Sequence, residues 1–225
     1  MKSQQQGFTL VEIAIVLVII GLLLGGILKG QEMITQAKIK NVIADFSGIS
    51  AAYYGYQDRY RAIPGDDSQA ATRWTGAVAG NGNGQVTGTY NTACPNTVVA
   101  GTAESCLWWD DLRRAGFVSG NGGSQPFNAM TGLLGVQTGD GASPVGPTLG
   151  TDGAGAGGFS GLIVCSANLS DKIAIATDTQ MDDGLPVSGT VRGLLQAAPN
   201  PNTAIQATAA YAENGTNTYL LCRAL

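Results

Sequence analysis

The chain contains no histidine among its 225 residues. Histidine is the commonest general base near neutral pH, the commonest metal ligand and the middle member of a Ser-His-Asp triad. Its absence argues against most enzymes, and we expect no catalytic residues. The composition leaves room only for a hydrolase built on paired carboxylates, for which the candidates are Asp66, Asp67, Asp182 and Asp183.

Charge is also scarce, at 12% of the residues. Lys and Arg total 12 against 16 Asp and Glu, the formal net charge is -4, and no stretch concentrates the positive residues. Nucleic-acid binding therefore has no electrostatic support. The 33 glycines and the low charge favour a Gly-rich extracytoplasmic domain over a charge-rich disordered chain or a collagen-like one.

Proline is absent before Pro64, and charge is almost absent from residues 8–28, where Glu12 is the only ionisable side chain. A helix over these residues is about 31 Å long, the thickness of a hydrocarbon core. A secretory signal has a shorter apolar core followed by a small-residue cleavage site, and no such site follows Leu28. We therefore predict a single membrane-spanning helix.

The polar stretch MKSQQQG precedes this run, and GFTLVE begins it at Gly7. This arrangement resembles the prepilin signature of type IV pilins and type II secretion pseudopilins. In that family a prepilin peptidase cuts after the glycine and methylates the new amino terminus. The resemblance implies a leader of residues 1–7, cleavage between Gly7 and Phe8, and N-methylation of Phe8. It covers about the first 60 residues, because pilin heads diverge.

Glu12 is the unusual residue of the run. An acidic side chain in a membrane helix costs about 2.5 to 3.5 kcal/mol near the centre and less near an end. The resemblance implies that its partner is the amino group of Phe8 on a neighbouring subunit. Two opposite charges about 4 Å apart attract by roughly 4 kcal/mol at an effective dielectric of 20. This attraction offsets the cost of burying the Glu12 carboxylate only when neighbouring subunits pack in register. The alternatives are a glutamate at the lipid headgroups and a plain anchor without an assembly role.

Gly21 and Gly25 lie four residues apart on one helix face. This spacing permits close helix packing in membranes, although glycine is also simply commoner in membrane helices than in soluble ones. Many major pilins carry a proline late in this run, whereas this chain does not. Major pilin, minor pilin and pseudopilin therefore all stay open.

Apolar residues recur at threes and fours from Ile39 to Tyr60, which predicts an amphipathic stem helix over residues 29–62. Ile63-Pro64-Gly65 ends it. The Tyr-rich stretch Tyr53–Arg61 is better explained as a buried face than as a binding patch.

The head, residues 63–225, has fewer clear elements. We expect a short helix at Cys106–Phe117, then long Gly-rich loops between short strands up to Gly161. Trp108 and Trp109 could form a ligand platform, but we favour one tryptophan in the core and its neighbour half exposed. Strands are predicted at Gly161–Ala167 and at 217–225, while Ile173–Ala176 suits a helix or a strand.

The four cysteines suit two disulfides in an exported head, and their wide spacing contains no C-x-x-C metal pair. Three connectivities exist. We favour one that ties the terminal strand to a central one, with the pairs Cys94–Cys106 and Cys165–Cys222.

No cofactor is expected. Some pseudopilins bind calcium in a head loop, which makes Ca²⁺ at Asp178, Asp182 and Asp183 the one weak metal candidate. The spacing lacks an EF-hand pattern, so a solvated turn is the preferred interpretation. Asp66 and Asp67 receive the same interpretation.

Together these features predict an α+β, pilin-like fold: a long amino-terminal helix, with a membrane half and an amphipathic half, packed on a small antiparallel sheet with long Gly-rich loops. The expected function is structural, as a prepilin in a type IV pilus-like filament, with a type II secretion pseudopilin as the alternative. A minor tip pilin whose head binds DNA or a surface is a further alternative.

The expected partners are other copies of the chain or related pilins, the prepilin peptidase, the inner-membrane assembly machinery and, before assembly, membrane lipid. No nucleic acid is indicated. We expect a single-pass protein of the bacterial inner membrane with a periplasmic head, which then moves to a surface pilus or a periplasmic pseudopilus.

Overall fold

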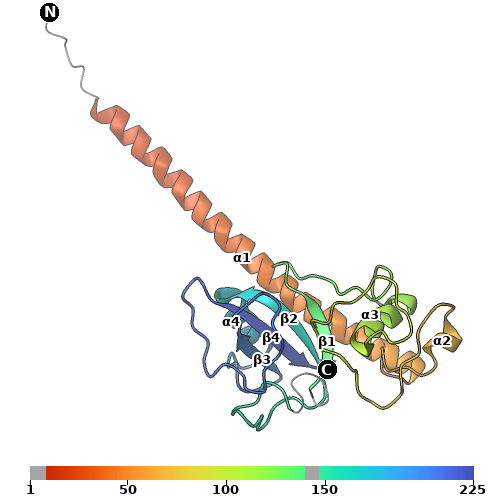
Figure 1. Cartoon of the computed structure of the whole chain (residues 1–225). Helices are drawn as coiled ribbons and strands as arrows, with labels where there is room; N and C mark the ends of the chain where they lie inside the picture. Colours follow the sequence, from red (N-terminus) through yellow and green to blue (C-terminus); the bar gives the residue numbers. More distant parts are fainter. Residues whose placement is uncertain (1–8, 140–146) are drawn as a thin grey trace, which may run out of the picture. The chain divides into compact units, whose positions relative to one another are not determined.

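The structure is a computed structural model that describes residues 9–139 and 147–225 (Figure 1). The predicted cleavage site at Gly7 and Phe8 lies outside these residues. The helices are α1 (Leu10–Tyr60), α2 (Ala70–Arg73), α3 (Glu104–Arg114) and α4 (Asp171–Met181). The strands are β1 (Leu134–Thr138), β2 (Leu162–Ser170), β3 (Val191–Leu195) and β4 (Thr218–Ala224).

The chain divides into two compact units, residues 1–38 and residues 39–225. In the first unit, the described part of α1 exposes its large apolar side chains along its length. The second unit contains the rest of α1, the sheet and the other helices.

The sheet has four strands in the order β1-β2-β4-β3, and every neighbouring pair is antiparallel (Figure 1). The final strand of the chain is therefore internal to the sheet. The predicted strands correspond to β2 and β4, whereas the edge strands β1 and β3 were not predicted individually. The stretch Ile173–Ala176, for which helix and strand were both open, is part of helix α4.

One face of the sheet contributes to the main core. There Val164, Tyr219 and Leu221 pack with the buried face of α1, which includes Val42 and Phe46. The opposite face is covered by loop residues that form a second cluster around the internal disulfide. Because side chains alternate across a strand, neighbours such as Ile163 and Val164 enter different clusters. The predicted long helix on a small antiparallel sheet is thus confirmed.

The end of α1 lies two residues before residue 62, the bound expected for the stem helix. α1 stops at Tyr60, and Arg61 has a left-handed backbone with φ 55°. Gly65 follows with φ 81°, and a Cβ atom there would lie 2.4 Å from the carbonyl oxygen of Glu104. The turn therefore needs glycine both for its backbone angle and for its close approach to α3.

One packing prediction for α3 was wrong. One of the two tryptophans was expected to be half exposed, but Trp108 is fully buried and Trp109 is only 1% exposed. The two indoles meet edge to face, with centroids 4.9 Å apart. The segment after α3 folds back on the helix, where Val118 N donates to Leu112 O and the Val118 side chain packs against the same core.

Two buried acids fix a Gly-rich loop that has no regular secondary structure. Asp66 accepts the backbone N–H groups of Gly82, Asn83 and Gly84 at 2.6 to 3.1 Å. Glu104 accepts those of Asn81 and Thr87, together with the Asn81 amide.

The expectation that Asp66 and Asp67 form a solvated turn was therefore wrong, since they are 5% and 1% exposed. Asp67 accepts hydrogen bonds from the Tyr56 hydroxyl at 2.7 Å and from Gln69 N at 2.8 Å, and it forms an ion pair with Arg73. Charged groups are tolerated in a protein interior when they are paired and hydrogen-bonded in this way.

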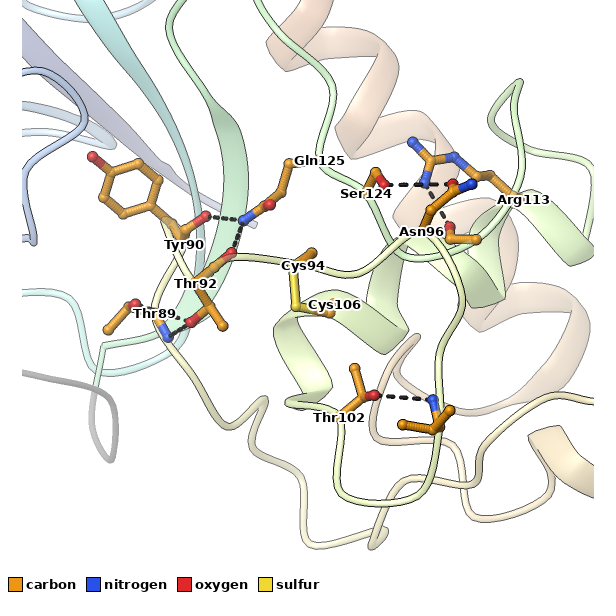
Figure 2. The surroundings of a disulfide bond; sticks show 12 residues. Thr89, Tyr90, Thr92, Cys94, Asn96, Thr102, Cys106, Arg113, Ser124 and Gln125 are labelled. Carbon is orange, nitrogen blue, oxygen red and sulfur yellow. Dashed lines mark hydrogen bonds between the residues drawn. A yellow bond between two sulfur atoms is a disulfide. The ribbon is translucent and has the colours of Figure 1, made fainter.

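The disulfides are Cys94–Cys106 and Cys165–Cys222, the pairing that the sequence favoured. Cys165 and Cys222 lie directly opposite each other on β2 and β4. Figure 2 shows Cys94–Cys106, which ties an irregular segment to α3. The same segment is held by Gln125, whose amide donates to the carbonyls of Tyr90 and Thr92 at 2.8 and 2.7 Å.

Candidate functional site

The first turn of α1 contains Glu12, the acidic residue of the apolar run. Glu12 is exposed, and it is the only charged residue between Leu10 and Leu28. Its Oε2 accepts hydrogen bonds from the Thr9 backbone N–H at 2.8 Å and the Thr9 hydroxyl at 2.9 Å. The Glu12 N–H donates to Thr9 Oγ1 at 3.3 Å.

These reciprocal bonds form a capping box, with Thr9 as the cap and Glu12 in the first helical turn. The carboxylate also lies at the positive end of the helix dipole, where a negative charge is favourable. Sequence reasoning missed this local role, although the Thr-x-x-Glu spacing carries its signature. A carboxylate has about four acceptor sites, so the cap leaves room for a further donor from outside the chain.

The helix that Glu12 begins is open to its surroundings. Within the described residues, α1 is the one helix long and apolar enough to cross a membrane. Its residues Leu10 to Leu28 are all exposed. A Cβ atom added at Gly21 or Gly25 would meet no heavy atom within 4 Å. This half of α1 therefore presents an apolar surface to lipid or to other helices. At Gly21 and Gly25 the missing side chains allow another helix to approach closely.

The three carboxylates considered for calcium do come together. Asp178, Asp182 and Asp183 each place one oxygen within 4.8 Å of the others. Asp178 is fully buried, contrary to the expected solvated turn, and accepts hydrogen bonds from the Tyr211 hydroxyl at 2.5 Å and from Gly184 N at 3.2 Å.

The other two acids are also occupied by protein donors. Asp182 accepts from Val191 N at 2.9 Å and from Thr190 N, while Asp183 accepts from the Ser188 hydroxyl and Leu185 N. Burial raises the pKa of Asp178 to about 6. These hydrogen bonds join the end of α4 to the start of β3, so they give the three carboxylates a structural role.

A further acidic group lies under the turn that follows α1. Asp111 accepts the Gly65 N–H through Oδ2 at 2.7 Å, and its Oδ1 is buried without a hydrogen bond in the described structure. Burial, and to a lesser extent the nearby Asp67 and Asp110 carboxylates, raise the pKa of Asp111 to about 7. Structural contacts thus account for each of Asp66, Asp67, Asp182 and Asp183, the residues considered for a hydrolase.

The comparison with protein families places a motif over the start of the chain. Residues 2–28 match the prokaryotic N-terminal methylation motif, which is typical of type IV pilins and type II secretion pseudopilins. No curated protein matches the chain at a significant level. The motif implies processing by a prepilin peptidase and assembly into a filament, and with the apolar helix it indicates anchoring in the inner membrane before assembly.

A long helix on a four-stranded antiparallel sheet, together with this motif, defines a pilin-like structural protein, a class that is generally not enzymatic. More particularly, the motif makes the chain similar to prepilin subunits of the pilin and pseudopilin type.

Proposed function

We propose that the chain is cleaved between Gly7 and Phe8, methylated on the new amino terminus, and assembled helix to helix into a type IV pilus-like filament. Gly7 directs the cleavage, Phe8 supplies the processed amino group, and residues 8–28 serve first as membrane anchor and then as filament core. The head, residues 63–225, forms the outer part of the filament.

The observation that carries this proposal is one carboxylate on an otherwise uncharged, uncovered helix. Glu12 is bonded only to Thr9 within the described chain, and the surface around it is apolar. Removing a carboxylate from water is costly without a cationic partner. The amino group of Phe8 on a neighbouring subunit supplies that cation in the filament.

A type II secretion pseudopilin is the second candidate, because the same motif is typical of both groups. In that case the filament stays in the periplasm and is short. Imaging of filaments sheared from the cell surface, with identification of their main protein by mass, separates the two candidates. A tip pilin would appear there only in traces.

The test of the mechanism uses two matched variants. Glu12→Gln keeps the size of the side chain and one acceptor oxygen for the Thr9 cap but removes the charge, so we expect loss of most filaments while the processed protein stays in the membrane. Thr9→Ala removes the capping hydroxyl but keeps the carboxylate, so filaments are expected to persist. Filament yield is measured by electron microscopy and by immunoblotting of the sheared fraction.

Mass spectrometry of the purified protein tests the processing step. We expect a chain that begins at Phe8 and carries one added methyl group. Mature protein that retains residues 1–7, or Glu12→Gln subunits that assemble as readily as the parent, would contradict the proposal.

A further inference from the structure

The head unit has an apolar groove beside the second half of α1. Its volume is about 340 Å³, and Asp45 and Ser119 line it together with mainly apolar side chains. Ala44 and Gly48 form part of the wall on α1, and Phe117 and Phe127 form part of the opposite wall. Phe127 is 65% exposed, so the groove displays aromatic surface that nothing in the described chain covers. The two small residues on α1 leave room for another helix to approach closely.

One charged group lines this groove. Asp45 is half-buried on the α1 wall and makes no hydrogen bond or ion pair within the described residues. Burial alone raises the pKa of its carboxyl. A half-buried carboxylate without a partner is unfavourable, and a cation brought to it would relieve that cost. The apolar side chains and the single carboxylate of the groove therefore suit a ligand with an apolar surface and one positive charge.

The chain itself has a segment of this description. Leu28, Met33 and Ile34 on α1 are 67%, 65% and 58% exposed. Met33 and Ile34 lie beyond the stretch that ends at Leu28, which already spans a hydrocarbon core, so lipid does not account for them. Lys29 lies one helical turn before Met33, on the same face. It pairs with exposed Glu32 at 2.8 Å, and its three donor hydrogens leave capacity for a second partner.

The segment cannot reach the groove of its own chain. Lys29 and Asp45 belong to one continuous helix and are separated by about 24 Å along its axis. A second copy has no such restriction.

We propose that the groove receives residues 28–34 of a second copy of this chain, with Lys29 bound to Asp45 and Met33 against Phe117 and Phe127. The two α1 helices then run parallel, displaced by about 24 Å along their axes. Methionine suits this contact because its flexible thioether packs well against aromatic rings. The contact rests on the proposed function and specifies which head surface meets which part of the neighbouring helix.

The direct test couples native groups in filaments of the parent protein. A water-soluble carbodiimide joins a lysine to a carboxylate that it touches, and peptide mass spectrometry then identifies the joined residues. We expect Asp45 joined to Lys29. Lys38 and Lys40 on the same helix serve as internal controls. Coupling of Asp45 to either of these alone, to a lysine of a different protein, or to none would overturn the proposal.

Charge exchange gives a second, independent measurement. Asp45→Lys and Lys29→Asp are each expected to lower filament yield about fivefold or more, and the two together to restore it to within about twofold of the parent. Asp45→Lys with Lys40→Asp is the matched control and should restore nothing. Membrane levels and intact disulfides on non-reducing gels show that each variant folds.

The outcomes separate the two proposals. If the parent forms filaments but the exchanged pair does not recover, the docking contact is wrong and the filament function stands. If the parent forms no filaments, the function fails and the contact falls with it.

Discussion

Asp111 has an unusual environment for an acidic side chain. Within the described residues only one of its oxygens accepts a hydrogen bond, from Gly65 N, and the residue is 1% exposed. Burial accordingly raises its pKa to about 7, against about 3.9 for an unfolded aspartate. The folded head therefore binds a proton that the unfolded chain has already released between these two values.

This shift makes stability depend on pH. The proton-linked stabilisation is fully present below about pH 4 and is lost as the pH rises through about 7. We expect the melting temperature of the parent in detergent to fall between pH 5 and pH 8. Asp111→Asn carries no charge at any pH, so its melting temperature should fall less, by a difference on the order of 5 °C.

Asp178 has a pKa raised to about 6 and acts in the same direction, but it is common to both proteins, so the difference reports on Asp111. Asp58→Asn, at an exposed carboxylate on α1, should follow the profile of the parent. Parallel pH profiles for the parent and Asp111→Asn would show that Asp111 is not the responsible group.

At the scale of single elements, α1 was predictable because its signals are local. The apolar run, the spacing of Val42, Phe46 and Tyr53, and the Pro64-Gly65 stop each lie within one helix or at its end. The edge strands were not predictable individually because each is short and contains a glycine, Gly135 or Gly193, a residue that is depleted in strands. These glycines are required by covering segments: a Cβ atom would lie 1.9 Å from Tyr90 O or 2.5 Å from the Tyr211 hydroxyl oxygen.

The candidate site likewise has some features that local sequence predicts and others that it does not. The motif around Glu12 is contiguous and was found from the sequence, and its Thr9 cap could have been found in the same way. The burial of Asp66 was not predictable, because its partners Gly82 and Gly84 follow 16 and 18 residues later in a loop without a pattern of its own. The groove around Asp45 joins α1 to residues such as Trp109 and Phe127, 64 and 82 positions after Asp45, which no local rule connects.

The two disulfides belong to different elements and should differ in their effect on stability. Cys165–Cys222 closes a separation of 57 residues and joins two internal strands, whereas Cys94–Cys106 closes only 12. The loop-entropy relation gives about 4 kcal/mol for the first and about 3 kcal/mol for the second. We expect Cys165→Ala with Cys222→Ala to lower the melting temperature further than Cys94→Ala with Cys106→Ala, by about 3 °C. Equal losses, or the reverse order, would contradict this ranking.

At the scale of the whole molecule, the two units differ in what their surfaces require. The residues of both hydrophobic clusters in the described chain, from Ile39 onward, lie in the second unit. The large apolar side chains of the first unit are exposed, from Leu10 to Ile34. The first unit therefore needs lipid or neighbouring helices, while the second has a core of its own.

This division predicts that residues 39–225, exported to the periplasm without the first unit, form a soluble monomer with both disulfides. The core contacts of Ile39, Val42 and Phe46 are kept, and the apolar surface that needs lipid is removed. Light scattering after gel filtration should give the mass of one chain, and near-ultraviolet circular dichroism should show ordered aromatic side chains. The full chain, measured in parallel, should require detergent. Because segment 28–34 is missing, the fragment should also stay monomeric when concentrated; aggregation or a molten spectrum would mean that the head depends on the first unit for its fold.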